Sequence, residues 1–369
     1  MHRPAGMRWV PERGCKGVGD VESRSARNRS PLASSPSGAL HVRADDLVRI
    51  GRLREDAEIP VVVEPAVDDA DPVSWLASRR EIVKDELGLR GALLLRGFEG
   101  VDRGVFEAIA RTLSPELMPY LDQHTPRTAL GGGIYTSTEY PPEGTVPFHS
   151  ENSKNRRWPM LLMFCCVRPA PLGGETPIAD NRRVYERIPR PIRERFAESG
   201  VTYVRNYGHG IGVPWQTAFE SEDPEAVERR CRELSLHCEW LGSGRLRVRH
   251  VAQGVARHPR SGEMLWFNQA HLFHSSQITP DLRAALLQTV GADATPSEAL
   301  YGDGSPIEDA TIEVIAEAYR SAAVRFPWKA GDVLVLDNML VSHGRLPYRG
   351  DRLVLVAMAQ PCEAGASDR

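Results

Sequence analysis

The sequence predicts a mainly β fold with helical insertions, an α+β chain built on a β-sandwich or barrel-like core. Short runs of β-branched, aromatic and other apolar residues recur along it, and segments with apolar residues at helical spacing separate them. Short strands that alternate with inserted helices are typical of such a core. Strands are expected at residues 91–97, 160–167, 201–204, 245–251, 264–267, 333–336 and 353–359.

Length and composition indicate one large domain. The chain has 369 residues, of which 41% are hydrophobic and 26% charged, as in an ordinary globular protein. Residues 1–44 are rich in Arg, Ser, Gly and Pro and show no apolar periodicity, so we expect a disordered extension there. A targeting peptide is disfavoured because the stretch has no continuous apolar run. Residues 45–369 are expected to form the single domain.

The first elements after this extension follow an α+β pattern. Apolar residues at helical spacing predict helices at residues 72–88 and 105–113, on either side of the strand at 91–97. Three consecutive glycines open a segment at residues 131–142. It lacks the strand-then-helix context of a phosphate-binding loop, and we interpret it as a flexible lid.

The central and C-terminal elements are predicted in the same way. Residues 160–167 are apolar without interruption, which indicates a core strand. Residues 169–177 contain three prolines and two glycines, and they predict a turn. Further helices are expected at residues 184–198, 224–234, 280–290 and 307–322.

Charge and cysteine content exclude several classes of function. The formal net charge of −3 gives no electrostatic reason to bind nucleic acid or an anionic membrane, and no segment is apolar and long enough to span a bilayer. The six cysteines form no C-x-x-C pair, and Cys165 and Cys166 are adjacent in an apolar run. This pattern predicts reduced thiols and a cytoplasmic protein.

One motif carries recognisable chemistry. On a strand or extended segment, His149 and Glu151 point to the same face because the side-chain period is two. His343, just beyond the buried run at 333–336, is our candidate for a third ligand. Two imidazoles and one carboxylate form the facial triad of non-haem Fe(II) oxygenases.

Two other patterns compete for a metal. His237 and Glu239 form a second H-x-E, which follows a charged helix and lacks a downstream Gly-Gly-x-Thr turn. His271 and His274 form an H-x-x-H pair that can bind zinc on a helix, but no Cys or Glu partner lies nearby in sequence. We favour His149 and Glu151 over the first pattern, and we expect the second to pack near the site without metal.

Several motifs occur in a recognisable order along the chain. They are His149-Ser150-Glu151, Gly173-Gly174-Glu175-Thr176, the run from Trp266 to His274, Asp337-Asn338-Met339, His343-Gly344-Arg345, and Arg352. Together they resemble the taurine-dioxygenase/clavaminate-synthase superfamily, and within it the syringomycin-type aspartyl β-hydroxylases of peptide-antibiotic pathways. The resemblance covers residues 91–361 and implies a double-stranded β-helix (jelly-roll) core, Fe(II), 2-oxoglutarate and O₂.

The resemblance assigns roles to individual residues. It implies that His149, Glu151 and His343 bind iron, that Arg352 pairs with the distal carboxylate of 2-oxoglutarate, and that Thr176 adds a hydrogen bond to it. A guanidinium suits this role because it pairs with a carboxylate in a bidentate fork. The short spacing from His343 to Arg352 leaves Arg345 and Arg349 as competitors.

The implied reaction is hydroxylation of an aliphatic C–H with formation of succinate. Halogenating relatives carry a small residue where this chain has Glu151, so halogenation is not expected, whereas desaturation and cyclisation use the same ligands. A non-catalytic jelly-roll binding protein is the alternative from another class. An amino acid, free or bound to a carrier protein, is the expected substrate, with Arg205 and Asn268, and near them Asn206 and Gln269, as its polar contacts.

Overall fold

The computed structural model describes residues 47–120, 127–208, 212–290 and 295–364. Its largest unit is an eight-stranded sheet in the order β1-β2-β3-β17-β7-β20-β5-β4. Every neighbouring pair in this sheet is antiparallel except β2 and β3. Its strands are β1 (Val48–Arg52), β2 (Val61–Pro65), β3 (Ala92–Leu95), β4 (Ala129–Gly131), β5 (Ile134–Thr136), β7 (Arg157–Arg168), β17 (Val333–Asp337) and β20 (Leu353–Glu363).

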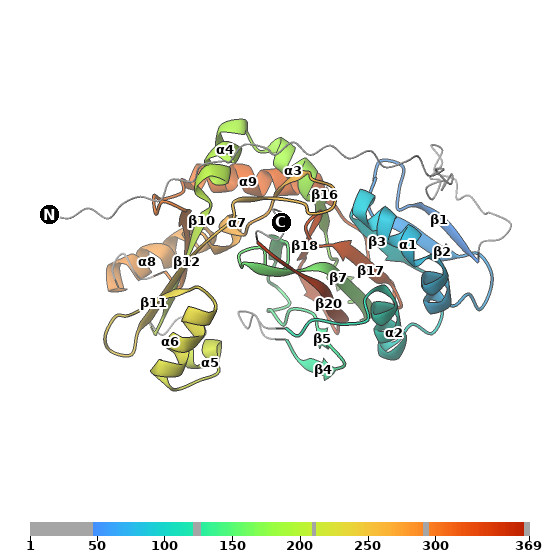
Figure 1. The fold of residues 1–369 in the computed structure, drawn as a ribbon, viewed down its shortest axis with the longest axis horizontal. Coiled ribbons are helices and arrows are strands. Elements are labelled where there is room, and N and C mark those ends of the chain that lie inside the picture. The colour runs from blue at the N-terminus through green and yellow to red at the C-terminus, as the bar shows by residue number, and fades with distance from the viewer. Residues whose placement is uncertain (1–46, 121–126, 209–211, 291–294, 365–369) are drawn as a thin grey trace, which may run out of the picture. The chain divides into compact units, whose positions relative to one another are not determined.

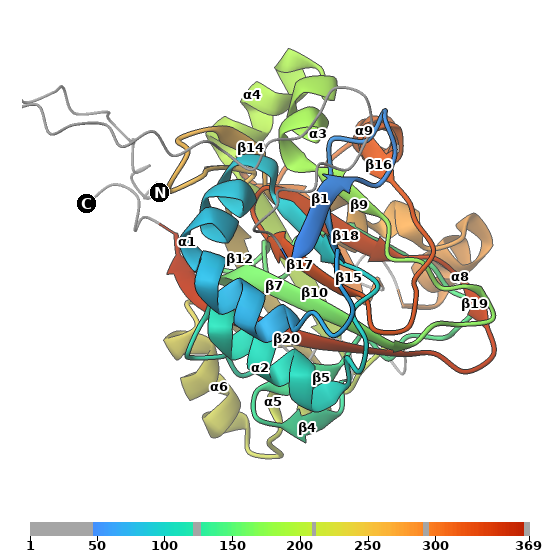
Figure 2. The ribbon, with the colours of Figure 1, turned by 90° about the vertical axis from the view of Figure 1, so that its right-hand side faces the viewer.

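The uninterrupted apolar run at residues 160–167 lies in strand β7, and the position of this strand in the sheet explains it. Side chains alternate between the faces of a strand, and both faces of this sheet are covered. Met163 packs toward α1 (Pro72–Arg90) and α2 (Arg103–Leu113), with Leu76 and Phe106. Phe164 belongs to the core on the opposite face. Figure 2 shows the two helices lying over the sheet.

A smaller sheet faces the side of the large one that these helices leave open. Its order is β16-β9-β18-β6, with β16 (Ala323–Val324), β9 (Ile178–Asp180), β18 (Val341–Arg345) and β6 (Val146–His149). Ile178 of β9 and Val341 of β18 share one buried cluster with Phe164. Two sheets packed face to face in this way form the expected sandwich-like core.

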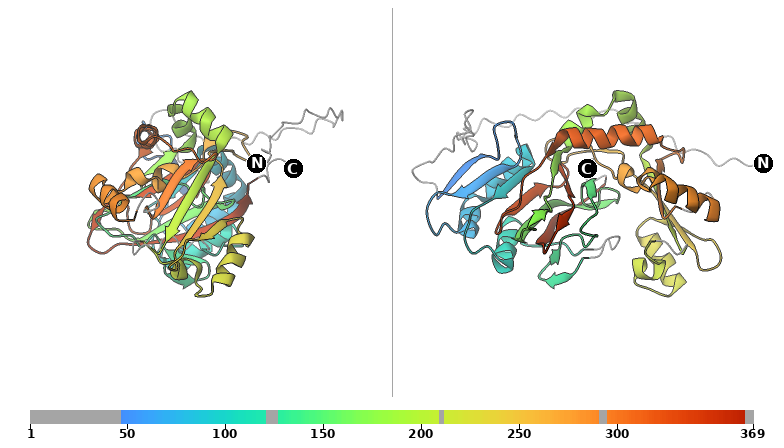
Figure 3. Two further views of the ribbon diagram at one scale, coloured as in Figure 1. Left: turned by 90° about the vertical axis from the view of Figure 1, so that its left-hand side faces the viewer. Right: turned by 180° about the vertical axis from the view of Figure 1, so that it is seen from behind.

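The remaining elements are insertions between the strands of this core. A third sheet has the order β11-β12-β10-β15, and α6 packs on β11 (Figures 1 and 3). Its strands are β10 (Val201–Tyr207), β11 (His237–Trp240), β12 (Leu246–Ala252) and β15 (Ser297–Tyr301). The inserted helices are α3 (Asn181–Arg187), α4 (Arg190–Ser199), α5 (Trp215–Phe219), α6 (Pro224–Glu233), α7 (Ala270–Phe273), α8 (Pro280–Val290) and α9 (Asp309–Ala322). Two short two-stranded sheets pair β13 (Val255–Arg257) with β14 (Met264–Trp266) and β8 (Leu172–Gly173) with β19 (Tyr348–Arg349).

The mainly β fold with helical insertions is confirmed, but some expected elements were wrong. The helix expected at 184–198 is two helices, because Pro189 forces Ile188 into an extended conformation that ends α3. The first part of the expected lid is the turn of the β4–β5 hairpin. Several strands were missed, including β9 and β15. The first helix continues to Arg90 and is capped by Gly91, whose φ of 84° is left-handed.

Three expectations concern the chain as a whole. The disorder expected for residues 1–44 lies outside the described residues. The five cysteines within the described ranges are free thiols, as expected. Among the helices of the described ranges, none has the length and apolar character needed to cross a bilayer.

Candidate active site

A pocket lies between the small sheet and the inner face of the large one. It contains about 340 Å³ of empty space, part of which is open to solvent. Its lining combines side chains from β6, β7, β18 and β20 with residues just after β5 and just before β9 and β20. The lining residues are Ser137, Thr138, Val146, His149, Phe164, Thr176, His343, Gly344, Arg345, Arg352 and Val354.

Three potential metal ligands converge at this pocket. His149 ends β6 and His343 lies in β18, where the two are register partners with ring centroids 4.3 Å apart. Glu151 follows two residues after His149, in a turn beyond the end of the strand. The ligand atoms of the three residues lie within 4.8 Å of one another. Two strands and one turn therefore bring together residues that are distant in the sequence.

The state of the imidazoles suits metal ligation. Burial lowers the pKa of His149, and it lowers the pKa of His343 well below its usual value, so both rings are neutral. Nδ1 of His149 lies 2.9 Å from the carbonyl oxygen of Pro147, which can only accept. Nδ1 therefore carries the proton and Nε2 offers its lone pair. Two neutral imidazoles and a carboxylate fit a divalent iron ion.

The backbone of Glu151 is held by Asn338, which is fully buried. The amide oxygen of Asn338 accepts from the Glu151 N–H at 2.7 Å. Its amide nitrogen donates to the carbonyls of Glu151 at 2.9 Å and Pro159 at 2.8 Å. Asn338 thereby fixes the turn that carries Glu151 to the start of β7.

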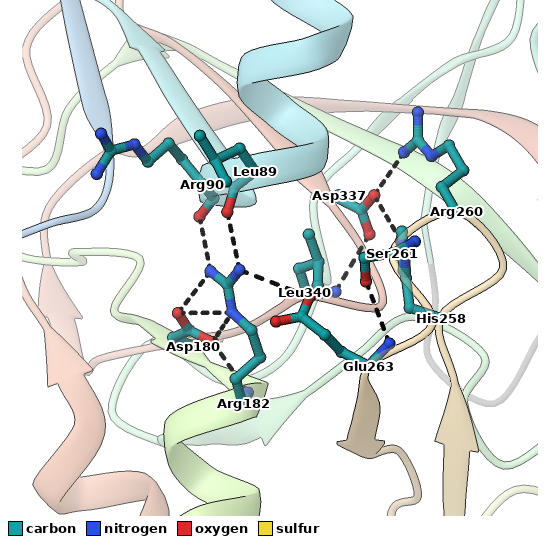
Figure 4. Close-up of polar contacts among 10 residues, drawn as sticks. All are labelled: Leu89, Arg90, Asp180, Arg182, His258, Arg260, Ser261, Glu263, Asp337 and Leu340. Atoms are coloured by element: carbon teal, nitrogen blue, oxygen red, sulfur yellow. Dashed lines mark hydrogen bonds and ion pairs between the residues drawn. The ribbon is translucent and has the colours of Figure 1, made fainter.

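The turn from β17 to β18 has its own anchor, drawn in Figure 4. Oδ1 of Asp337 accepts from the backbone N–H groups of Met339 and Leu340, and Oδ2 contacts His258 at 3.1 Å and Arg260 at 2.6 Å. With Asp337 only 1% exposed, these bonds satisfy a buried carboxylate. The anchored turn fixes where β18 starts, and thus where His343 lies.

Arg352 extends into the pocket from the start of β20. Its Nε donates to the carbonyl of Gly174 at 2.9 Å, and its terminal nitrogens lie 3.3 Å from Ser137 Oγ and 3.5 Å from Thr176 Oγ1. Burial lowers its pKa to about 10, so it stays charged at neutral pH. Within the described residues its hydrogen-bond acceptors are all neutral. A partly buried cation with only neutral acceptors provides a site for an anion.

Gly174 has a steric reason to be glycine. Its φ of 76° is left-handed, and a Cβ there would lie 3.0 Å from Cδ and 3.1 Å from Nε of Arg352. The Gly-Gly turn therefore lets Arg352 pass closely over the backbone. Thr176, two residues later, is 3% exposed and accepts from the indole N–H of Trp328 at 3.1 Å.

The two competing arginines have other surroundings. Arg345 lines the pocket, but its guanidinium donates to the carbonyls of Tyr140 at 2.7 Å, Pro141 at 2.6 Å and Gly144 at 2.7 Å. It ties the segment before β6 to β18. Arg349 is exposed in β19 and does not line the pocket. The guanidinium of Arg345 is held by three backbone carbonyls and Arg349 lies away from the pocket, and the assignment of the cosubstrate to Arg352 stays a prediction.

The competing histidine patterns do not form a metal site among the described residues. Residues 237 and 239 lie in β11, at the outer edge of the third sheet, where both are exposed. Nε2 of His271 lies 2.8 Å from the Phe148 carbonyl, and Nε2 of His274 lies 3.0 Å from that of Ile307. His271 therefore packs behind β6 and supports it.

The polar residues expected to contact substrate divide into two groups. Asn268 donates to the Gly254 carbonyl and accepts from the Ala270 N–H, so both ends of its amide are used internally. Asn206 and Gln269 also bond internally, to the Thr295 and Ser150 carbonyls. Arg205 is not among the residues that line the pocket, and its guanidinium lies 5.8 Å from the Tyr207 ring centroid and 5.5 Å from that of Phe273.

One charged residue of the site was not predicted from the sequence. Arg127 contacts Oε2 of Glu151 at 2.8 Å, and both side chains are buried. The two residues are 24 positions apart and follow no motif. Neither periodicity nor motif spacing carries a signal for this pair.

Known proteins match this fold and site. Residues 55–358 match the family described as taurine catabolism dioxygenase TauD, TfdA family. The chain belongs to this family. The dapdiamide synthesis protein DdaC of Enterobacter agglomerans is 39% identical over 317 residues, which cover 83% of this chain and 96% of DdaC. A clavaminate synthase-like protein of Arabidopsis thaliana is 30% identical over 315 residues, covering 82% and 91% of the two chains.

Solved structures support the fold of this TauD/TfdA family member. The crystal structure of PvcB from Pseudomonas aeruginosa aligns with a TM-score of 0.53 at 16% identity, covering 87% of this chain and 94% of PvcB. PvcB is described as an Fe, alpha-ketoglutarate dependent oxygenase from an isonitrile synthetic pathway. At this identity the alignment shows the fold alone, and it confirms the expected jelly-roll class.

Family membership confirms two further expectations. The enzyme class is that of the 2-oxoglutarate-dependent dioxygenases, and its cofactors at the level of the family are iron and 2-oxoglutarate. Among the described residues, His149, Glu151 and His343 are the group that could hold a metal ion, and the two histidines line the same pocket as Arg352.

Proposed function

We propose that this TauD/TfdA family member is an Fe(II)- and 2-oxoglutarate-dependent hydroxylase that acts on an aliphatic C–H of an amino acid, free or bound to a carrier protein. The main support is one observation: His149 and His343 of a two-histidine, one-carboxylate cluster line the same pocket as the partly buried Arg352, whose hydrogen-bond acceptors are neutral. These are the groups that a divalent iron ion and a dicarboxylate each need.

Two sets of residues have separate roles in this proposal. His149, Glu151 and His343 hold the iron, while Arg352 and Thr176 hold the distal carboxylate of 2-oxoglutarate. With iron and 2-oxoglutarate bound, the site supplies the activation of O₂ that oxidises the C–H bond. Phe164, Val146 and Val354 give the pocket an apolar wall. This wall excludes water from the reacting carbon and strengthens the electrostatic contacts around it.

The substrate class rests on one residue and one relative. The guanidinium of Arg205 makes no hydrogen bond or ion pair to the described residues and lies against two aromatic rings, which suits the recognition of a carboxylate. DdaC, a relative at 39% identity, is named for dapdiamide synthesis. We therefore propose an amino-acid substrate and a role in peptide-antibiotic biosynthesis. Asn268 stays a predicted substrate contact, but both ends of its side-chain amide form hydrogen bonds within the protein, which does not support this role.

The choice of reaction follows from Glu151. A halide needs a coordination position that a carboxylate ligand fills, so hydroxylation is favoured over halogenation. Desaturation and cyclisation need the same ligands and are the second candidates. The cytoplasmic location inferred from the cysteines stays a prediction.

Incubation with Fe(II), 2-oxoglutarate, ¹⁸O₂ and a panel of amino acids, free and carrier-bound, tests the proposal. Mass spectrometry is expected to find a product heavier by one labelled oxygen, together with succinate, with no effect of added chloride. His343→Ala should form neither product nor succinate. A chlorinated product would reject hydroxylation, and loss of two hydrogens without oxygen would move the enzyme to the desaturases.

A further inference from the structure

Glu151 meets a cation that the proposed ligand set does not include. Oε2 of Glu151 lies 2.8 Å from a terminal nitrogen of Arg127. The side chains of Arg127 and Glu151 are only 4% and 8% exposed, so the contact is shielded from water. A buried charge-assisted hydrogen bond of this length restricts the orientation of both groups.

Arg127 is itself positioned by the large sheet. Its guanidinium lies over the ring of Tyr120, 4.5 Å from the centroid. The backbone N–H of Tyr120 donates to the hydroxyl of Tyr135 at 3.1 Å, and Tyr135 is a register partner of Val356 in β20. The guanidinium is thus tied to β20, the strand that begins just after Arg352.

The two ends of Glu151 are therefore fixed by different elements. Asn338 fixes the backbone through hydrogen bonds to both the N–H and the carbonyl, at 2.7 and 2.9 Å. Arg127 binds one oxygen of the carboxylate. A Glu side chain has three rotatable bonds, and a free carboxylate can turn either oxygen, or both, toward a cation. With Oε2 engaged by Arg127, Oε1 is the oxygen without this contact and the better placed of the two for a metal.

We propose that Arg127 is a positioning residue that holds Oε2 of Glu151, so that Glu151 presents a single oxygen to the iron. The inference rests on the proposed function, because it takes Glu151 as a metal ligand. Two effects oppose each other: a nearby guanidinium repels a metal cation, and it also orients the ligand. Residues that hydrogen-bond to metal ligands change metal affinity or activity about 10- to 100-fold when replaced, which favours the orienting effect.

Binding of Mn(II), followed by the electron paramagnetic resonance signal of the free ion, tests this role without turnover. Arg127→Met removes the guanidinium and keeps an apolar stem. We expect its dissociation constant for Mn(II) to rise about 10- to 100-fold. Arg127→Lys keeps one charged donor group, and its dissociation constant for Mn(II) should lie between those of the wild type and Arg127→Met. Arg190→Met is the matched control, since Arg190 pairs with Glu194 on the exposed side of α4 and should bind Mn(II) as wild type.

The outcomes separate the roles open to Arg127. Unchanged Mn(II) affinity in Arg127→Met would assign Arg127 to substrate binding or to structure and overturn the proposal, and tighter binding would show that repulsion dominates, which overturns it too. Should Arg127→Met fail to fold, Tyr120→Leu, which removes the ring beneath the guanidinium, must weaken Mn(II) binding for the proposal to stand. Wild-type protein that binds no Mn(II) at all would instead reject the proposed function.

Discussion

Arg352 gives the sharpest test of the cosubstrate site. Its guanidinium is partly buried beside neutral acceptors, the Gly174 carbonyl at 2.9 Å and the hydroxyls of Ser137 and Thr176 at 3.3 and 3.5 Å. Its pKa of about 10 keeps it charged at neutral pH. The bound carboxylate of 2-oxoglutarate would be its only full negative partner in this set. Arg352→Ala would leave that carboxylate buried and unpaired.

The expected magnitude follows from the burial. Truncating one partner of a buried, hydrogen-bonded charge pair costs about 2–5 kcal/mol, so the dissociation constant of 2-oxoglutarate should rise by about one to three orders of magnitude. Arg352→Lys should lose less, because it keeps the charge and loses the planar fork. Isothermal titration of Mn(II)-loaded protein without O₂ measures binding apart from turnover.

Arg349→Ala is the matched control for this prediction. Arg349 lies three residues before Arg352, is exposed, and does not line the pocket. Its removal should change the dissociation constant of 2-oxoglutarate by less than about threefold, as for most exposed charges. Equal effects of Arg349→Ala and Arg352→Ala, or a larger effect of Arg349→Ala, would refute the assignment of Arg352.

Three further predictions concern stability, the metal and the thiols. The guanidinium of Arg96 donates to both carboxylate oxygens of Asp332, at 3.0 and 2.6 Å, and Asp332→Ala leaves it buried without this partner. Urea titrations should show a free energy of unfolding lowered by about 3–5 kcal/mol. A loss below about 1 kcal/mol, the value of an exposed pair, would contradict this. Mn(II) titrations should show that His149→Ala abolishes binding while His237→Ala has no effect, and the reverse result would place the metal at the other H-x-E. Burial raises the pKa values of Cys165 and Cys166 to about 12. Iodoacetamide at a mildly alkaline pH should therefore leave both thiols unmodified in the folded protein and modify both in denaturant. Rapid labelling of the folded protein would show that the core strand is open.

The parts of the fold that could be predicted are those with a strong local pattern. Residues 160–167 of β7 and 333–336 of β17 are apolar without a break, because both faces of the large sheet are covered. The short strand β9 is only three residues long, too short for a period to show. Pro189 was the available signal for the break between α3 and α4, but the apolar spacing that continues across it favoured one unbroken helix.

The candidate site divides in the same way. The pair His149 and Glu151 has a spacing of two, which a sequence displays directly. Asn338 and Arg127 act on Glu151 from 187 positions downstream and 24 positions upstream. Such contacts depend on how the strands pair, and a single sequence holds no periodicity that records them. For Arg352, the sequence predicts only part of its environment. The apolar run that follows it indicates burial, but no pattern indicates the neutral acceptors around it.

A crystal structure of the protein with Mn(II) and N-oxalylglycine, a non-reactive analogue of 2-oxoglutarate, tests the proposed metal and cosubstrate sites together. We expect an anomalous scattering peak from manganese within bonding distance of His149, Glu151 and His343. The distal carboxylate of the analogue is expected to pair with Arg352. A manganese peak at His237, or an analogue whose carboxylate pairs with Arg349, would contradict the proposed sites.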